Sequence, residues 1–188
     1  MDNNIVFEKQ NILNTNIDDL QKLYDNILNI DNDKIEKFNI LTSSDLHHYT
    51  KKSFISNEKT DIYKYKLIHT PTQTVYASRP HKYQDGYKIF ISTTDKYNVF
   101  IDNCGMTQSI AFILCDNKKQ AEEYLDILIH PLYVFLNNIC RWGNFNNIRI
   151  LQKFPKPIIK DYNKTNESII FDYFILSNEE ILFIKNKL

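Results

Sequence analysis

Apolar residues near the start of the chain recur at helical spacing. In the segment 17–30, IDDLQKLYDNILNI, they fall three or four residues apart, and two aspartates occupy the first turn. This pattern predicts an amphipathic helix with acidic side chains at its N-terminus. A second, shorter helix is predicted over 33–41, and the polar segment 42–60 is predicted to be a loop or a weak helix. We therefore expect residues 1–60 to form a helical N-terminal extension.

From Tyr63 onward the apolar residues follow the pattern of short strands. Five segments rich in β-branched and aromatic residues are predicted strands: 63–70, 74–78, 87–92, 97–101 and 108–115. Turn signals separate them, among them Pro71, Asp85-Gly86 and the stretch 103–105. The connections are too short for parallel crossovers, so antiparallel hairpins are expected.

A long helical pattern follows the strands. Its apolar stripe covers about 117–142, and Pro131 inside it is expected to kink the helix or to divide it in two. Gly143 ends the pattern, and 144–160 is predicted to be an extended exit segment.

The C-terminal residues complete the predicted fold. Ser177 and Glu180 have the spacing of a capping box, which predicts a helix from about residue 178. The expected class is α+β: an N-terminal helical segment, a central and mostly antiparallel sheet, one long proline-interrupted helix packed on it, and a C-terminal helix. Residues 61–188 are expected to form the main domain.

The biased composition makes single residues weak indicators of function. Of 188 residues, 27 are Ile, 22 Asn and 20 Lys, whereas only 3 are Arg. This bias is typical of AT-rich coding sequence, so individual Asn and Lys residues carry little functional information. Only three glycines are present, which argues against glycine-rich phosphate loops. The three cysteines are widely spaced and are expected to be reduced and partly buried.

Charge is distributed unevenly although the net charge is zero. Residues 1–62 hold 7 basic and 11 acidic side chains, residues 63–160 hold 13 and 7, and residues 161–188 hold 3 and 5. A basic middle section between acidic ends permits a phosphate-facing surface. Chance variation is the alternative explanation.

No targeting or membrane segment is evident. The chain has no run of 18 or more apolar residues, and its first residues have no signal-peptide pattern. We therefore expect a soluble, intracellular, cytoplasmic protein without a membrane partner.

Three stretches together resemble a known protein family. They are YKIFISTTDKYNVFIDNCGMTQSIAFILCDN (87–117), LDILIHPLYVFLNNICRWGNFNNIRILQKFPKP (125–157) and LSNEEILFIK (176–185). Their order and spacing are similar to those in the C-terminal target-recognition regions of type II restriction–modification N6-adenine DNA methyltransferases and of related fused restriction enzymes. The hairpin segment LIHTPTQTVYAS (67–78) fits the same pattern, so the resemblance covers about residues 60–188. It implies a domain that recognises DNA.

The catalytic half of that family has no counterpart in the chain. The sequence contains neither a [DNS]-P-P-[YFW] tetrapeptide, which would position a flipped adenine, nor a glycine-rich methyl-donor loop. Base-flipping methylation needs a base pocket and a cofactor site. The resemblance therefore implies a non-catalytic module that binds double-stranded DNA and needs no cofactor. It could act with a separate methyltransferase or nuclease as its catalytic protein partner.

The segment GMTQS is the most specific candidate for DNA contact. Gly105 suits a turn with positive φ. Thr107, Gln108 and Ser109 offer hydroxyl and amide groups that fit phosphate oxygens or adenine edges. The structural alternative is a polar turn that leads into the next strand.

A second group of candidates surrounds the predicted hairpin tip. Thr93, Thr94 and Lys96 occupy the tip, and loop tips on a rigid sheet are frequent reading surfaces. Basic residues nearby in the sequence are predicted to contact the DNA backbone: Arg79, Lys82 and Lys88. A solvated polar turn explains the tip equally well.

The segment RWGNFNN (141–147) has two interpretations. Arg141 and Asn144 are candidates for DNA contact, with Trp142 stacking or wedging beside them. Alternatively, Trp142 and Phe145 cap the core at the helix end, and Arg141 complements the helix C-terminus. We favour packing, because the corresponding turn serves mainly for packing in the family that the segment resembles.

Other chemistries find little support in the sequence. The histidines have no carboxylate or cysteine at metal-ligand spacing, and His47-His48 would point apart in regular structure. Cys104 precedes a glycine, but no base or oxyanion donor accompanies it. Asp95-Lys96 is only a fragment of a nuclease triad. We therefore predict neither a metal site nor an enzyme.

Two classes of function remain. The first is a DNA-recognition module. The second is a protein–protein interaction or structural protein that keeps the fold without binding DNA, which zero net charge and few arginines favour. The distribution of the lysines in 63–160, on one face or scattered, discriminates between them.

Overall fold

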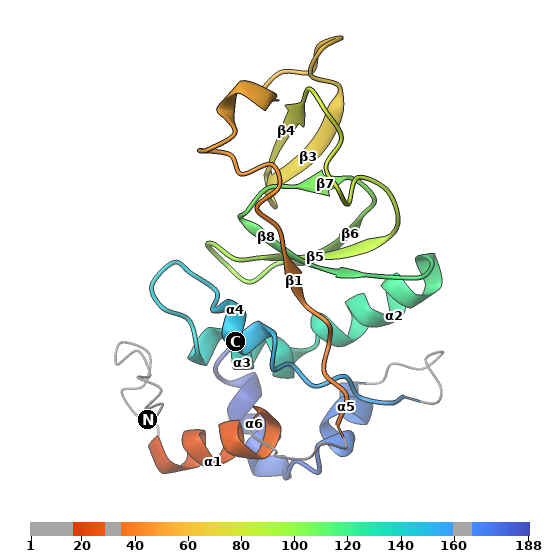
Figure 1. Ribbon diagram of the computed structural model, residues 1–188. Coiled ribbons are helices and arrows are strands. Elements are labelled where there is room, and N and C mark those ends of the chain that lie inside the picture. Colours follow the sequence, from red (N-terminus) through yellow and green to blue (C-terminus); the bar gives the residue numbers. More distant parts are fainter. Residues whose placement is uncertain (1–16, 29–34, 160–166) are drawn as a thin grey trace. The chain divides into compact units, whose positions relative to one another are not determined.

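The computed structural model describes residues 17–28, 35–159 and 167–188. Contacts divide the chain into two compact units: residues 39–125, called here the β unit, and residues 1–38 with 126–188, called the helical unit (Figure 1). The division does not follow the predicted boundary at residue 60, because the segment between 39 and 60 contributes strands to the β unit. The expected α+β class is confirmed.

Two four-stranded sheets make up the β unit, where a single central sheet was expected. Their strand orders are β1-β8-β5-β6 and β2-β4-β3-β7, and every pair is antiparallel except β3 with β7. The strands are β1 Leu41–Thr42, β2 Ile55–Ser56, β3 Tyr65–Thr70, β4 Gln73–Ala77, β5 Lys88–Ser92, β6 Val99–Asp102, β7 Gly105–Met106 and β8 Ile110–Leu114, and a 3-10 helix η2 covers Lys52–Phe54.

Strand β5 lies inside its sheet and is buried along its whole length. It pairs with β8 on one side and with β6 on the other, so that Phe90 is opposite both Phe112 and Phe100. A strand that is covered on both faces has a nearly continuous apolar sequence, as in KIFIS.

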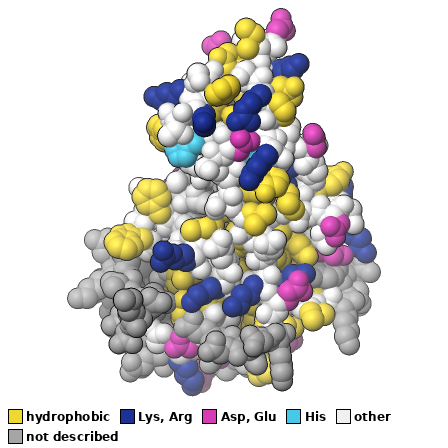
Figure 2. Space-filling view, viewed as in Figure 1, with side chains coloured by type: hydrophobic (Ala, Val, Ile, Leu, Met, Phe, Trp, Pro, Cys, Tyr) yellow, Lys and Arg dark blue, Asp and Glu magenta, His cyan; other side chains and the backbone are white. Residues whose placement is uncertain are grey.

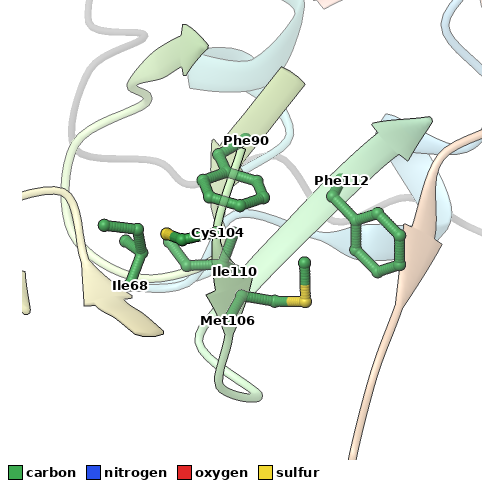
Figure 3. Packing of buried hydrophobic residues seen from close by; sticks show 6 residues of the cluster. All are labelled: Ile68, Phe90, Cys104, Met106, Ile110 and Phe112. Atoms are coloured by element: carbon green, nitrogen blue, oxygen red, sulfur yellow. The ribbon is translucent and has the colours of Figure 1, made fainter. Parts of the chain in front are cut away.

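A hydrophobic cluster joins the two sheets of the β unit (Figure 3). It comprises Ile68, Phe90, Cys104, Met106, Ile110 and Phe112, which come from β3, β5, β7, β8 and the turn before β7. Gly105 allows β7 to approach β3, because a Cβ at this position would lie 2.6 Å from Leu67 Cδ2 and 2.7 Å from His81 Cβ. The expected positive φ at Gly105 is wrong: the described glycines with positive φ are Gly86 and Gly143.

The helical unit contains five described helices and part of a sixth. They are α1 Ile17–Leu28, α3 Pro131–Ile139, α4 Ile148–Leu151, α5 Glu167–Tyr173 and α6 Asn178–Lys185, and α2 Lys118–Leu128 crosses from the β unit. Pro131 divides the predicted long helix between α2 and α3. His130 is the N-cap of α3 and accepts the Leu132 amide N–H at 3.2 Å, and Pro131, which has no N–H to place, follows it.

Aromatic rings hold the helical unit together around α3. Tyr133 is fully buried, lies edge-on to Phe154 with ring centroids 5.3 Å apart, and donates its hydroxyl to the Pro155 carbonyl at 2.7 Å. Phe135 packs against Phe183 of α6 with centroids 5.8 Å apart. A capping box between Ser177 and Glu180 begins α6, as the sequence predicts.

Two other expectations about the elements are wrong within the described residues. The segment 35–40 is not helical; the Phe38 amide instead donates to the Phe154 carbonyl at 3.0 Å. The exit segment contains α4 before it becomes extended at 154–159. Residues 29–34 of the predicted N-terminal helices lie outside the described residues. None of the helices in the described ranges is long and apolar enough to cross a bilayer.

Candidate nucleic-acid interface

The predicted hairpin tip and the GMTQS segment lie side by side in the β unit. Ser92 at the end of β5 pairs with Ile110 at the start of β8, and the Thr93 amide donates to the Ser109 carbonyl at 3.1 Å. Thr93, Thr94 and Ser109 are half-buried, and Lys96 is exposed. The Ser92 hydroxyl donates to the Thr94 carbonyl, which ties the tip to the strand. Four predicted contact residues thus share one end of the sheet.

Arg79, in the loop that follows β4, is already paired. Its guanidinium binds Asp45, with Nη2 at 2.8 Å from Oδ1 and Nη1 at 3.4 Å from Oδ2, and lies 5.5 Å from the Phe54 ring centroid. Asp45 also accepts the Lys82 amide at 2.8 Å. The Arg79 hydrogen bond holds the pKa of Asp45 below its usual value, against the effect of burial. Arg79 is therefore a clamp between two loops, and its guanidinium is not free for phosphate.

The two neighbouring lysines have opposite environments. Lys82 is exposed, and its ammonium lies 4.7 Å from the Tyr83 ring centroid. Lys88 is fully buried and donates its ammonium to the carbonyls of Asp85 and Gly86 at 2.8 and 2.7 Å. Burial lowers the pKa of Lys88. The expected DNA contact at Lys88 is corrected: the side chain closes a turn at the opposite end of β5 from the hairpin tip.

Thr107 and Gln108 also hold the fold. Thr107 is fully buried, and its hydroxyl lies 2.8 Å from His69 Nδ1. The Gln108 carbonyl oxygen accepts the His48 amide at 2.8 Å. Burial lowers the pKa of His69, and so does the ring of His48, which stacks on it with centroids 4.2 Å apart. Thr107 is thus withdrawn from the predicted interface, and the Gln108 side chain is bound at both ends, since its amide nitrogen donates to Ser109 Oγ at 3.4 Å.

A serine and a histidine meet in the same region without the arrangement of a catalytic pair. The Ser43 hydroxyl lies 2.9 Å from His81 Nε2, while His81 Nδ1 accepts the Tyr83 amide at 3.0 Å. Burial lowers the pKa of His81 to about 4, so the ring is neutral. With Nδ1 acting as acceptor, the proton is on Nε2, and His81 donates to Ser43 instead of accepting its proton. The pair joins β1 to the loop before β5.

Burial raises the pKa of all three cysteine thiols. Cys104 is buried, which raises its pKa to about 12, and its thiol donates to the Gly105 carbonyl at 3.3 Å. A thiol that stays protonated is a poor nucleophile. Among the described residues, no group of three or more His, Cys, Asp or Glu side chains could hold a metal ion.

The segment 142–145 of the helical unit, called here the aromatic turn, projects two rings from the surface. Trp142 is 83% exposed and Phe145 is 63% exposed. Their backbones pair with each other, N to O at 3.1 and 3.0 Å, across Gly143 and the exposed Asn144. Gly143 has φ +55, a conformation that a residue without Cβ adopts easily. The favoured packing interpretation of Trp142 and Phe145 is therefore wrong.

Buried groups fix the aromatic turn in place. Asn146 is 3% exposed, and its side chain accepts the amide of Asn137 from α3 at 2.9 Å. Asn147 is the N-cap of α4 and accepts the Arg149 amide at 3.0 Å. Residues 142–145 and Asn147 line a wide, open depression of the surface. The rings thus stand out from an anchored support.

The aromatic turn lies in a segment rich in positive charge. From residue 127 to residue 160 the chain has five basic side chains and no acidic one. Arg141 and Arg149 form no ion pair with any described carboxylate, and the Nε of Arg141 is buried without a hydrogen-bond partner among the described residues. Lys153 lies close enough to the buried Cys140 to oppose the rise of its pKa. Arg149 and Lys153 were missed, although the acid-free run and the clustering of two of three arginines could have indicated them.

Most of the basic side chains of the β unit are scattered or paired. Lys66 binds Asp102 at 2.7 Å, and Lys118 and Lys119 pair with glutamates one turn along α2. In the view of Figure 2, the Lys and Arg side chains of this unit are interleaved with acidic and hydrophobic ones. The charges visible there form no continuous basic patch.

Comparisons with protein-family models, with curated proteins and with solved structures find no match to this chain. The resemblance to target-recognition regions therefore rests on the sequence motifs alone.

Proposed function

We propose that this chain is a non-catalytic DNA-recognition module. The observation that carries the proposal is the convergence of the hairpin tip and the GMTQS segment, joined by the Thr93–Ser109 hydrogen bond at 3.1 Å, at one end of a sheet. Both segments lie within 87–117, one of the three stretches that carry the resemblance to target-recognition regions. Loops that a rigid sheet holds side by side are suited to reading a ligand.

The exposed groups at this end suit phosphate more than bases. Lys96 is exposed at the hairpin tip, Thr93, Thr94 and Ser109 beside it are half-buried, and Lys82 in the loop before β5 is exposed. Ammonium and hydroxyl groups contact phosphate oxygens and fix the register of a protein on DNA. Sequence readout in the major groove would require amides or arginines from elsewhere. The loop end of the β unit is thus proposed as a backbone-contacting surface, with a separate methyltransferase or nuclease as the catalytic partner that the resemblance implies.

Fluorescence anisotropy with labelled DNA of random sequence, duplex and single-stranded, at low and physiological salt tests this function. Because each phosphate contact releases counterions, affinity should fall as salt is added, and Lys82→Met or Lys96→Met should each reduce the slope of log affinity against log salt by about 1. Lys118→Met is the matched control, because Lys118 follows the opposite end of β8. Absence of binding even at low salt would reject the function.

The second candidate is an interaction protein that keeps the fold without binding DNA. The specific observation in its favour is that Arg79, Lys66 and Lys88 are satisfied within the β unit. A folded chain that shows no salt-sensitive DNA binding in the same experiment would favour this candidate. Wild-type binding with an altered slope in the two lysine variants would exclude it.

A further inference from the structure

The aromatic turn has the features of a binding site for a part of the nucleic acid other than the phosphate backbone, which is the proposed contact of the loops of the β unit. We propose that it is a stacking platform for an unpaired nucleobase, with Trp142 as the main ring and Arg141, Arg149 and Lys153 attracting the adjoining phosphates. This rests on the proposed function, because it names the form of nucleic acid that the module prefers. All residues of this platform belong to the helical unit.

The first step of the argument is that the rings are held outward. A flexible loop with two large apolar side chains would be expected to fold them against the protein, since burying apolar surface is favourable. Here Trp142 stays 83% exposed, while the neighbouring Asn146 is 3% exposed and hydrogen-bonded to the buried Asn137. The support is thus held by buried hydrogen bonds, and the described residues leave both rings largely exposed. Such an arrangement marks a contact surface.

The second step concerns the charge around the rings. Side chains between residues 127 and 160 are either uncharged or basic. Arg141 and Arg149 flank the aromatic turn, and neither pairs with a described carboxylate. An apolar protein surface would leave the charge of these guanidinium groups unpaired, whereas a polyanion would pair with it. The ligand is therefore expected to combine flat aromatic surface with negative charge, which are the properties of a nucleotide chain.

The third step distinguishes an unpaired base from a base pair. Bases inside a duplex already stack on their neighbours and offer no free face. Proteins that bind single strands place aromatic rings under successive bases beside a basic groove, and the stacking tolerates any base. Trp142 is 83% exposed and borders an open depression of the surface, so its ring is accessible to a base. Single-stranded DNA, or a base displaced from a duplex, is thus the favoured ligand.

The chain provides its own reporter, because Trp142 is its only tryptophan. Selective excitation of tryptophan would follow its emission while single-stranded DNA of about 12 nucleotides, the matched duplex, or anionic lipid vesicles are added. We expect strong quenching by the single strand and much weaker quenching by the duplex. A blue shift on vesicles without quenching by DNA would overturn the proposal in favour of a membrane contact. Protection of Trp142 from acrylamide in the free protein would also overturn it, because the ring would then be covered.

Substitutions of Trp142 test whether the ring that gives the emission signal also contributes to DNA affinity. Trp142→Ala should weaken single-strand binding about 10-fold or more, as expected for loss of one stacked base, and should change duplex binding much less. Trp142→Phe should recover part of the loss. Leu182→Ala is the matched control, because Leu182 is an exposed apolar side chain of the same unit. Circular dichroism would confirm that each variant is folded.

The outcomes separate the two proposals. If the wild type binds no DNA of either kind, the proposed function fails, and the platform fails with it. If the wild type binds DNA, the emission of Trp142 is unchanged and Trp142→Ala binds as well as the wild type, only the platform is rejected.

Discussion

Arginines of the β unit and of the helical unit are used in opposite ways. Arg79 binds Asp45 through both of its terminal nitrogens and covers the Phe54 ring. Arg141 and Arg149 have no described carboxylate partner and flank two exposed aromatic rings. A basic residue in a loop can thus be part of the scaffold, whereas a basic residue beside an exposed aromatic ring, with no described carboxylate partner, can bind a ligand.

The polar residues repeat this contrast. In the β unit, Thr107 and Gln108 are bound to His69 and to the His48 amide, and Lys88 is bound to two carbonyls. In the helical unit, Asn146 anchors the aromatic turn, and the neighbouring Asn144 stays exposed. Loops that lack regular hydrogen bonding use polar side chains to satisfy their backbone. Residue type therefore identifies possible contacts, and only the partners decide between scaffold and surface.

The largest expected effect is on stability and compares Lys88 with Trp142. Lys88→Ala removes a buried stem and leaves two carbonyls without their donor, which should destabilise the protein by about 2–4 kcal/mol. Trp142→Ala removes an exposed ring and should change stability by no more than about 0.5 kcal/mol. Urea unfolding followed by circular dichroism measures both. Lys88→Met, which keeps the stem, should lose less than Lys88→Ala, and equal losses in Lys88→Ala and Trp142→Ala would contradict the assignment of buried and exposed roles.

The sequence predicts the regular elements of this fold better than the environments of its polar residues. Short segments rich in β-branched and aromatic residues, separated by turn signals, identify β3, β4, β5, β6 and β8, and Pro131 and the capping box place two helix ends, because these features are local. The two-residue strands β1, β2 and β7 carry too little pattern to be recognised. Their pairing is also what produces two sheets instead of one.

The candidate site depends on contacts that are distant in sequence. Asp45, the partner of Arg79, lies 34 residues upstream, and His69, the partner of Thr107, lies 38 residues away. Lys88 could have been doubted, since it begins the apolar segment KIFIS, which is typical of a strand buried on both faces. The exposure of Trp142 had no local signal, because the same pattern of residues also fits a ring that caps the core.

The next largest effect is the pH dependence of stability. His81 in the folded protein has a pKa of about 4, below the value of 6.5 that it has without burial. As the pH falls below 6.5, the unfolded chain binds a proton that the folded chain does not, so stability is full above 6.5 and is lost between 6.5 and 4. At pH 5 the loss due to His81 should be about 2 kcal/mol. Urea unfolding across this range measures the slope.

Two histidine variants, one in each unit, show which histidine causes the dependence of stability on pH. His81→Asn keeps an acceptor for the Tyr83 amide and should lose stability at pH 7 but flatten the slope. Burial also lowers the pKa of His130 in the helical unit. His130→Asn should therefore leave the His81 contribution intact. An unchanged slope in His81→Asn would show that His81 is not neutral in the folded protein.

The smallest expected effects separate Arg79 from Arg149. Arg79→Met breaks an ion pair in which the arginine side chain is 39% exposed. Such partly exposed pairs contribute about 0.2–1 kcal/mol, and Asp45→Asn should cost a similar amount, with the double variant no worse than either single one. Arg149→Met breaks no described ion pair, so its stability should be unchanged within about 0.5 kcal/mol. On DNA the order reverses: Arg149→Met should reduce the salt slope by about 1 and Arg79→Met should leave it unchanged. An equal reduction in both variants would mean that Arg79 leaves Asp45 to meet phosphate, and the distinction between a paired and a free arginine would not hold.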